Sequence, residues 1–149
     1  MDFDFGSFRM SRAVLKGAIF RDSVSFGGVV LGEDATFGDA TFPDLPRFDR
    51  ATFAGDVQFR EAVFTERALF AGATLGGDAL LYEAGFAGIA TFAEATFHGG
   101  PRFCYAIFAG AARLDGSGVK SIDLDEGLCL SFRGPRIQVG KPFSGVVAH

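Results

Sequence analysis

The side chains best suited to chemistry lie close together in the sequence, at Arg102, Cys104 and Tyr105. A nearby arginine favours the thiolate form of a cysteine, which is its nucleophilic form. The second cysteine is Cys129, and the sequence has no CxxC pair and no His/Cys spacing typical of zinc ligands. We therefore expect neither a disulfide framework nor a zinc site, and we predict reduced thiols.

Other motifs that carry chemistry are absent from the sequence. It has no phosphate-binding GxxxxGK[ST], no GxSxG nucleophile motif and no GxGxxG between a strand and a helix. Acidic residues are plentiful, but none of them follows the ligand spacing of an EF-hand. We therefore predict no catalytic, cofactor-binding or metal-ligating residue, and we expect no cofactor.

Charge and hydropathy exclude further classes of partner. The formal net charge of -4 and the pI near 5.1 argue against direct nucleic-acid binding, which needs a basic surface to neutralise phosphates. The longest uncharged stretches, such as 68–77 and 84–93, are too short to span a membrane. The segment 1–5 lacks the basic start and apolar stretch of an export signal, so we expect a cytoplasmic protein.

A regular rhythm of large apolar residues indicates how these side chains are positioned. From residue 15 to residue 114 their spacing alternates strictly between five and six. The residue two before each is alanine in fourteen of nineteen units, and the residue two after is glycine or an acid in seventeen. The central residues are Leu15, Phe20, Phe26, Leu31, Phe37, Phe42, Phe48, Phe53, Phe59, Phe64, Phe70, Leu75, Leu81, Phe86, Phe92, Phe97, Phe103, Phe108 and Leu114.

This spacing predicts a coil of short extended segments. Steps of five and six scatter side chains over opposite faces of a helix, whereas in an extended chain the alanine and the large residue point the same way, inward. Four sides with alternating steps of five and six close a coil of twenty-two, which allows four or five coils. A flat, two-sided coil of half that length also closes and remains the alternative.

The tandem Ala-x-Phe units resemble the pentapeptide-repeat family. The resemblance implies an all-β fold, a right-handed, four-sided (quadrilateral) β-helix solenoid with about twenty-two residues in each coil and a C-terminal cap. We predict an N-terminal cap with an irregular first turn at 1–12, the β-helix at 13–116, and a C-terminal cap or dimerisation segment at 117–149. Phe3 and Phe8 keep the spacing of five, but Phe8 lies seven positions before Leu15, so we expect a distorted first turn.

The two ends of such a rod need covers, because a terminal coil otherwise exposes open edges and apolar side chains. Apolar residues in the last segment offer either a cap or a contact that pairs two molecules end to end, as in some relatives. A homodimer through the C-terminal cap is therefore a further prediction. The residues concerned are Phe132, Phe143, Val146 and Val147.

With this coil length, the outward residues sort into columns, three of which are acidic. Like charges stacked at strand spacing repel, so we expect that folding alone does not favour these columns. Two interpretations stay open: a partner favours the acids, or they are simply good corner residues that keep the rod soluble. Two of the columns flank the side built on Leu15, Phe37, Phe59, Leu81 and Phe103, which makes that side the most acidic. The columns are Asp22/Asp44/Glu66, Asp34/Asp56/Asp78 and Asp39/Glu61/Glu83.

The same side collects both tyrosines and several arginines, residue types that are favoured at protein interfaces. His98 projects from another side, where the same column holds Lys120 one coil later, so no nucleophile or acid is in evident reach. The candidate interaction face comprises Asp56, Arg60, Glu61, Asp78, Tyr82, Glu83, Arg102, Cys104 and Tyr105.

The leading functional prediction is a non-catalytic module, a rigid rod whose acidic, tyrosine-bearing face binds a protein partner. The resemblance implies a first alternative, because quinolone-resistance members of the family resemble B-form DNA and bind DNA gyrase. Outward threonines and interrupting residues such as Arg47, Arg60 and Arg113 weaken that alternative. The second alternative is an enzyme or accessory protein of a biosynthetic pathway that uses the surface of Tyr82, Cys104 and Tyr105.

Overall fold

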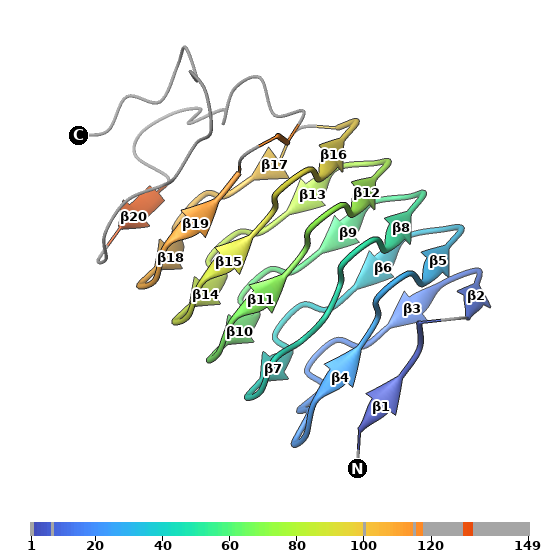
Figure 1. Cartoon of the computed structure of the whole chain (residues 1–149), viewed down its shortest axis with the longest axis horizontal. Helices are drawn as coiled ribbons and strands as arrows, with labels where there is room; N and C mark the ends of the chain where they lie inside the picture. The colour runs from blue at the N-terminus through green and yellow to red at the C-terminus, as the bar shows by residue number, and fades with distance from the viewer. Residues whose placement is uncertain (1, 7, 100, 115, 118–129, 133–149) are drawn as a thin grey trace.

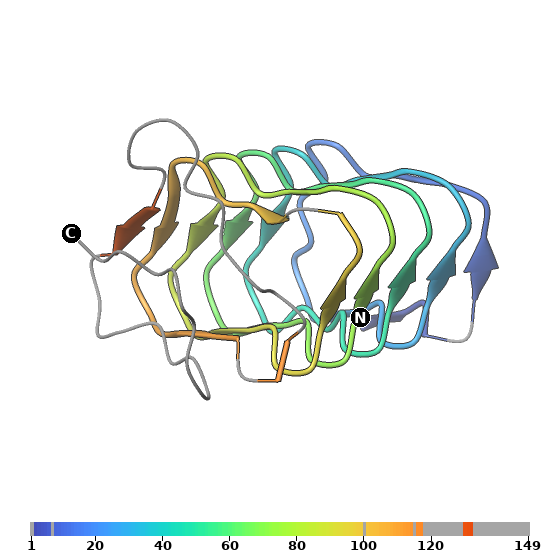
Figure 2. The same ribbon diagram turned by 90° about the horizontal axis from the view of Figure 1, so that it is seen from above.

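The computed structural model describes residues 2–6, 8–99, 101–114, 116–117 and 130–132. The described chain contains strands of two or three residues and no helix, so it contains no helix that could cross a membrane. The strands stack into a rod of coils with parallel strands along four sides (Figures 1 and 2).

We number the sides in chain order. The first side holds β1 (Phe3–Asp4), β4 (Val24–Ser25), β11 (Ala68–Leu69), β15 (Ala90–Thr91) and β19 (Ala112–Arg113), joined through single bridges at Arg47. The second side holds β2 (Arg9–Met10), β5 (Val30–Leu31), β8 (Thr52–Phe53), β12 (Thr74–Leu75) and β16 (Thr96–Phe97). The third side holds β3 (Ala13–Val14), β6 (Ala35–Thr36), β9 (Val57–Gln58), β13 (Ala79–Leu80) and β17 (Pro101–Arg102). The fourth side holds β7 (Thr41–Phe42), β10 (Val63–Phe64), β14 (Gly85–Phe86), β18 (Ala106–Phe108) and β20 (Leu130–Phe132).

The register confirms the predicted coil length. Thr52 pairs with Thr74 on the second side, and Val57 pairs with Ala79 on the third, so partners in neighbouring coils are twenty-two positions apart. The flat alternative is wrong, since it would place residues half that distance apart in sequence beside one another. The residue before each central residue faces outward, as alternation requires.

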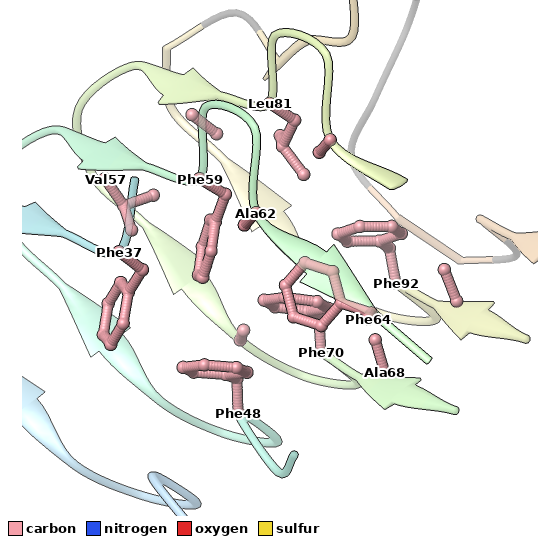
Figure 3. Packing of buried hydrophobic residues seen from close by; sticks show 14 of the residues in the cluster. Phe37, Phe48, Val57, Phe59, Ala62, Phe64, Ala68, Phe70, Leu81 and Phe92 are labelled. Carbon is pink, nitrogen blue, oxygen red and sulfur yellow. The ribbon is translucent and has the colours of Figure 1, made fainter. Parts of the chain in front are cut away.

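The core consists of the inward alanines and large side chains, none of them polar among the described residues. The first and fourth sides each hold a ladder of five nearly parallel phenylalanine rings, in which successive ring centroids are 4.7–5.1 Å apart. Rings of the third side meet those of the first edge to face, as Phe48 and Phe59 do at 5.3 Å (Figure 3). Both arrangements suit the aromatic quadrupole.

The shorter corners, those with a step of five, are tight turns of one kind. In each, the amide of the fourth residue donates to the carbonyl of the central residue, as Ala40 does to Phe37 at 3.1 Å. The third residue of the turn has a positive φ, the pattern of a type II turn that favours glycine. Glycine occupies this position at Gly17, Gly28, Gly72 and Gly116, whereas six other corners place a non-glycine residue there.

The first coil is irregular. Phe3 pairs with Val24, and Arg9 pairs with Val30, so this coil is one residue shorter than those that follow. Phe5 stacks on Phe26 at 4.9 Å, and Met10 packs against the core. The central residues of this coil are therefore Phe5 and Met10, and Phe3 and Phe8 stand two positions before them, because one residue is missing from the corner before Leu15.

At the other end, β20 continues the fourth side beside β18, with Ala106 opposite Leu130. The rest of the predicted C-terminal cap lies outside the described residues. The same holds for Lys120, Cys129 and the side chains proposed to pair two molecules at that end. The predicted domain boundaries and the homodimer through this segment therefore stay predictions.

Candidate functional site

The nine candidate residues lie on the third side and on the two corners that bound it. Asp56 and Asp78 stand at the longer corner, with a step of six, that enters this side, and Arg102 lies in β17. Arg60, Tyr82 and Cys104 share the first position of the shorter corner that leaves it. Glu61, Glu83 and Tyr105 share the next position, where φ is between 56° and 58°.

The entering column is built into the fold. Asp34 Oδ1 accepts a hydrogen bond from the backbone N–H of Asp56 at 2.9 Å, and Asp56 Oδ1 accepts one from Asp78 N–H at 2.8 Å. Each carboxylate thus satisfies an amide of the next coil at a corner, much as an acid caps a helix. The expectation that folding does not favour these acids is wrong for this column.

Glycines make that contact possible. A Cβ on Gly77 would overlap the Asp56 carboxylate and lie 2.7 Å from the Asp56 nitrogen, and Gly55 stands in the same relation to Asp34. Sequence reasoning missed this role of Asp34. The signal was present, because Gly55-Asp56 and Gly77-Asp78 are Gly-Asp pairs repeated one coil apart.

The leaving column has no comparable role in the backbone. Among the described residues, no amide donates to the carboxylates of Asp39, Glu61 or Glu83. Asp39 lies 3.9 Å from Lys16 Nζ and Glu61 lies 3.1 Å from Arg60 Nε, both exposed ion pairs that contribute little to stability. The left-handed backbone of these residues costs free energy that glycine would avoid.

Arg102 joins the two corners. It lies beside Leu80 in the ladder, and its guanidinium donates to the Tyr82 hydroxyl at 3.5 Å and to Asp78 Oδ2 at 3.4 Å. The hydrogen bond with Tyr82, followed by electrostatic attraction to Tyr82 and Asp78, raises the pKa of Arg102. The result is an exposed patch in which the arginine and tyrosine side chains orient each other.

The fourth side continues this patch beyond Tyr105. Tyr105 is 62% exposed, and Ile107, which follows it closely in β18, is 42% exposed. Cys104, which precedes Tyr105 in the same corner and follows Tyr82 by one coil in its column, is half-buried. The sequence did not single out Ile107, because only the corner geometry shows that the outward face of β18 adjoins Tyr105.

Of the residues that the structure describes, His98 and the possible metal ligands lie apart from the candidate face or do not cluster. His98 is exposed at the corner after β16, on the second side, as predicted. No group of three or more histidine, cysteine or acidic side chains could hold a metal ion within the described part of the chain.

The third acidic column stands at the corner between the fourth and first sides. Ser23 Oγ donates to Asp44 Oδ2 at 2.7 Å, and Leu45 N–H donates to Asp44 Oδ1 at 2.8 Å. These two hydrogen bonds, the serine's first, lower the pKa of Asp44 below its ordinary value of 3.8. This column is thus distinct in position and bonding from the candidate face.

Comparison with known proteins agrees with the geometry. A family model described as pentapeptide repeats, nine copies, matches residues 40–85 and 70–118, which together span more than half of the chain. The chain belongs to the pentapeptide-repeat family. No curated protein and no solved structure matches it. Membership of the pentapeptide-repeat family accounts for the stacked coils, and it leaves the outward residues to be interpreted from their own contacts.

Proposed function

We propose that this pentapeptide-repeat protein is a protein-binding module whose binding face is the C-terminal half of the third side, centred on Tyr82, Arg102 and Tyr105. A β-helix of stacked repeats supports a non-enzymatic role, since it supplies rigid outward columns and a core filled by its own side chains. The face combines a large aromatic area with a guanidinium held by its neighbours, and aromatic residues and arginine are the types enriched where proteins bind one another. Carboxylates lie beside them on the same face.

Tyr105 is the observation that carries the proposal. It occupies a left-handed position, with φ 58°, where the same corner of the first coil has Gly17. A tyrosine there costs about 1 kcal/mol or more of folding free energy relative to glycine. Because its side chain is 62% exposed, the burial of its ring offsets little of that cost. Six described corners place a non-glycine residue at this left-handed position, and Tyr105 is the one aromatic residue among them. An exposed tyrosine held on a rigid corner suits a binding role.

The charge pattern supports a general protein partner better than DNA gyrase. A DNA mimic needs an uninterrupted negative stripe, but Arg60 pairs with Glu61 and Arg102 pairs with Asp78 on this very face. The surface is therefore mixed in charge, and it suits a partner with a shallow apolar recess for tyrosine and a basic group near Glu83.

The test compares binding by folded variants. Immobilised wild-type protein captures its partner from a lysate of the native host, the partner is identified and purified, and its affinity is then measured by calorimetry. Tyr82→Ser and Tyr105→Ser should each weaken binding by about 1 kcal/mol or more. Arg102→Ser should weaken it too, whereas the matched control Arg47→Ser, an exposed, ion-paired arginine of the first side, should not.

Equal binding by wild-type protein and the Tyr82/Tyr105 double variant would reject this face. If the purified partner proves to be gyrase and binding falls steeply with salt, the DNA-mimic alternative replaces the proposal. If Cys104→Ser alone abolishes formation of a chemical product, the biosynthetic alternative replaces it.

A further inference from the structure

The first coil leaves its own core open. All eight inward side chains of the second coil are buried, whereas only Ala13 is buried among the eight of the first. Phe3 and Phe8 are 50% and 56% exposed, although the equivalent residues one coil later, Val24 and Val29, are 2% and 0% exposed. The N-terminal end therefore presents side chains whose positions mark them as core residues.

Outward apolar residues extend this surface. Val14 on the third side is 63% exposed, and Ile19 on the fourth is 72% exposed. Of the seven large apolar residues that are exposed within the described ranges, four belong to this single coil. The opposite end differs, because Phe108 and Leu114 are each only 3% exposed there.

The same end carries an open backbone edge. Leu15 N–H donates to Thr36 O at 2.8 Å, and Phe20 N–H donates to Thr41 O at 3.0 Å. One coil earlier, the equivalent carbonyls are those of Val14 and Ile19, and by the same direction they point away from the second coil. The first coil forms the end of the rod that carries β1, opposite the end with β20 (Figure 1). A parallel edge of this kind is a template for another strand.

The charges on the first coil are complementary to those on a second copy of the same coil. The exposed acid Asp4 lies on the first side of this coil, the exposed base Arg9 lies on the second, and Val14 and Ile19 lie on the third and fourth. Consider a two-fold axis perpendicular to the rod that passes through two opposite corners, the one between the first and second sides and the one between the third and fourth sides. This axis places the first side of one copy against the second side of the other, and the third side against the fourth. In that arrangement Asp4 meets Arg9, and Val14 meets Ile19.

We infer that the N-terminal end binds a second copy of this chain head to head about that two-fold axis, with β1 of one copy antiparallel to β2 of the other. The remaining two-fold axes of a four-sided rod are less favourable. Two of these axes place Asp4 of one copy against Asp4 of the other, or Arg9 against Arg9. The third axis places Asp4 against Ile19 and Arg9 against Val14, so that both charges face apolar side chains. The inference is independent of the proposed binding face on the third side.

Charge reversal tests this arrangement. The mass of the full chain in solution, measured by sedimentation over concentrations up to about 100 μM, should be twice 15.8 kDa. Asp4→Arg and Arg9→Asp should each raise the dimer dissociation constant about tenfold or more, because like charges then face each other. The double variant D4R/R9D, and an equimolar mixture of the two single variants, should recover dimers.

The recovery separates charge pairing from folding. Asp4 Oδ1 also accepts a hydrogen bond from Gly6 N–H at 2.8 Å, so D4R loses a local contact, but the double variant loses it as well. Circular dichroism and a thermal melt establish that each variant is folded. If D4R/R9D stays as weakly associated as the single variants, the proposed pairing of Asp4 with Arg9 is wrong.

A second pair of variants separates the end of the rod from its side. Ile19→Asp should give monomers, whereas the matched control Val63→Asp, in the same outward column two coils away and 43% exposed, should not. A monomeric wild-type protein would overturn the inference and leave this end to a different partner. A dimer that survives both D4R and Ile19→Asp would also overturn it, and would favour pairing through the C-terminal segment.

Discussion

Two columns of acids border the third side of the rod, and they have different roles. In the entering column, Asp34 and Asp56 each accept a backbone amide of the next coil at 2.9 and 2.8 Å. In the leaving column, Glu61 and Glu83 stand in left-handed backbone and accept no amide from the described residues. The comparison shows that stacked charge by itself does not identify a binding surface.

The type of corner explains the difference. The longer corner, with a step of six, leaves an amide turned toward the preceding coil, where a carboxylate can reach it past a glycine. In the shorter corner, an amide of the turn itself closes the turn, as Ala62 N–H does by donating to the carbonyl of Phe59 at 3.0 Å. Within the described coils, the carboxylate at the third position of this turn therefore has no backbone amide from which to accept a hydrogen bond. Charge there is available to solvent or to a partner.

The largest effect expected from this comparison is at Gly77. In Gly77→Ala the new methyl group displaces the Asp56 carboxylate and presses on backbone atoms 2.7 Å away, so we expect a loss of about 3 kcal/mol or more. Gly85→Ala, with nothing within 4 Å of the new methyl, should stay within about 1 kcal/mol of wild type. Urea denaturation measures both, and equal stability of the two variants would contradict the close approach.

Removal of the carboxylate is the next largest change. Asp56→Ala leaves the amide of Asp78 without its acceptor and should lower the free energy of unfolding by about 1–3 kcal/mol. Asp56→Asn keeps an acceptor oxygen and should lose less. Glu61→Ala, the matched change in the leaving column, should stay within about 0.5 kcal/mol of wild type in the same urea titrations. If Glu61→Ala proves as costly as Asp56→Ala, the two columns do not differ as described.

Substitution by glycine should give opposite signs in the two columns. Glu83→Gly relieves the positive φ of 57° and should stabilise the protein by about 0.5–1 kcal/mol, because the left-handed backbone is easier for glycine even after its greater flexibility when unfolded. Asp56→Gly should destabilise. Melting temperatures from calorimetry give the sign, and a lower melting temperature for Glu83→Gly would show that this acid has a structural contact.

The smallest effect concerns the third acidic column. Because two hydrogen bonds lower the pKa of Asp44 in the folded state, its contribution to stability is present above the ordinary pKa of 3.8 and is lost as the pH falls through the folded value. Carboxyl NMR should therefore show a midpoint below 3.8 for Asp44, which Ser23→Ala should raise. An unchanged midpoint in Ser23→Ala would show that the serine is not the main cause.

Much of the fold could be predicted from the repeat. The alternation of steps of five and six closes only certain coils, and the inward pairs such as Ala62 and Phe64 follow from extended backbone. The details of the first coil could not be predicted from the regular units, because a single missing residue before Leu15 makes Phe5 and Met10 the central residues and leaves Phe3 and Phe8 at the inward positions two before them. A rhythm read from regular units carries no information about a deletion at its own end.

The candidate site was predicted in part. The column assignment that follows from the coil length places Tyr82, Arg102 and Tyr105 on one side without any structure. The contact of Arg102 with both Tyr82 and Asp78 could not be predicted, because it depends on where a long side chain lies across the neighbouring coil.

By itself the sequence determined the coil length, the composition of each internal ladder and the column to which each outward residue belongs, because these follow from spacing and from alternation along an extended chain. Only the tertiary structure decided which acids are structural and which are exposed without a backbone partner. Asp56 and Glu61 are both acids at corners of the same coil, and their difference depends on whether an amide of the next coil points at the carboxylate. That direction is a property of the folded corner, not of the residue type.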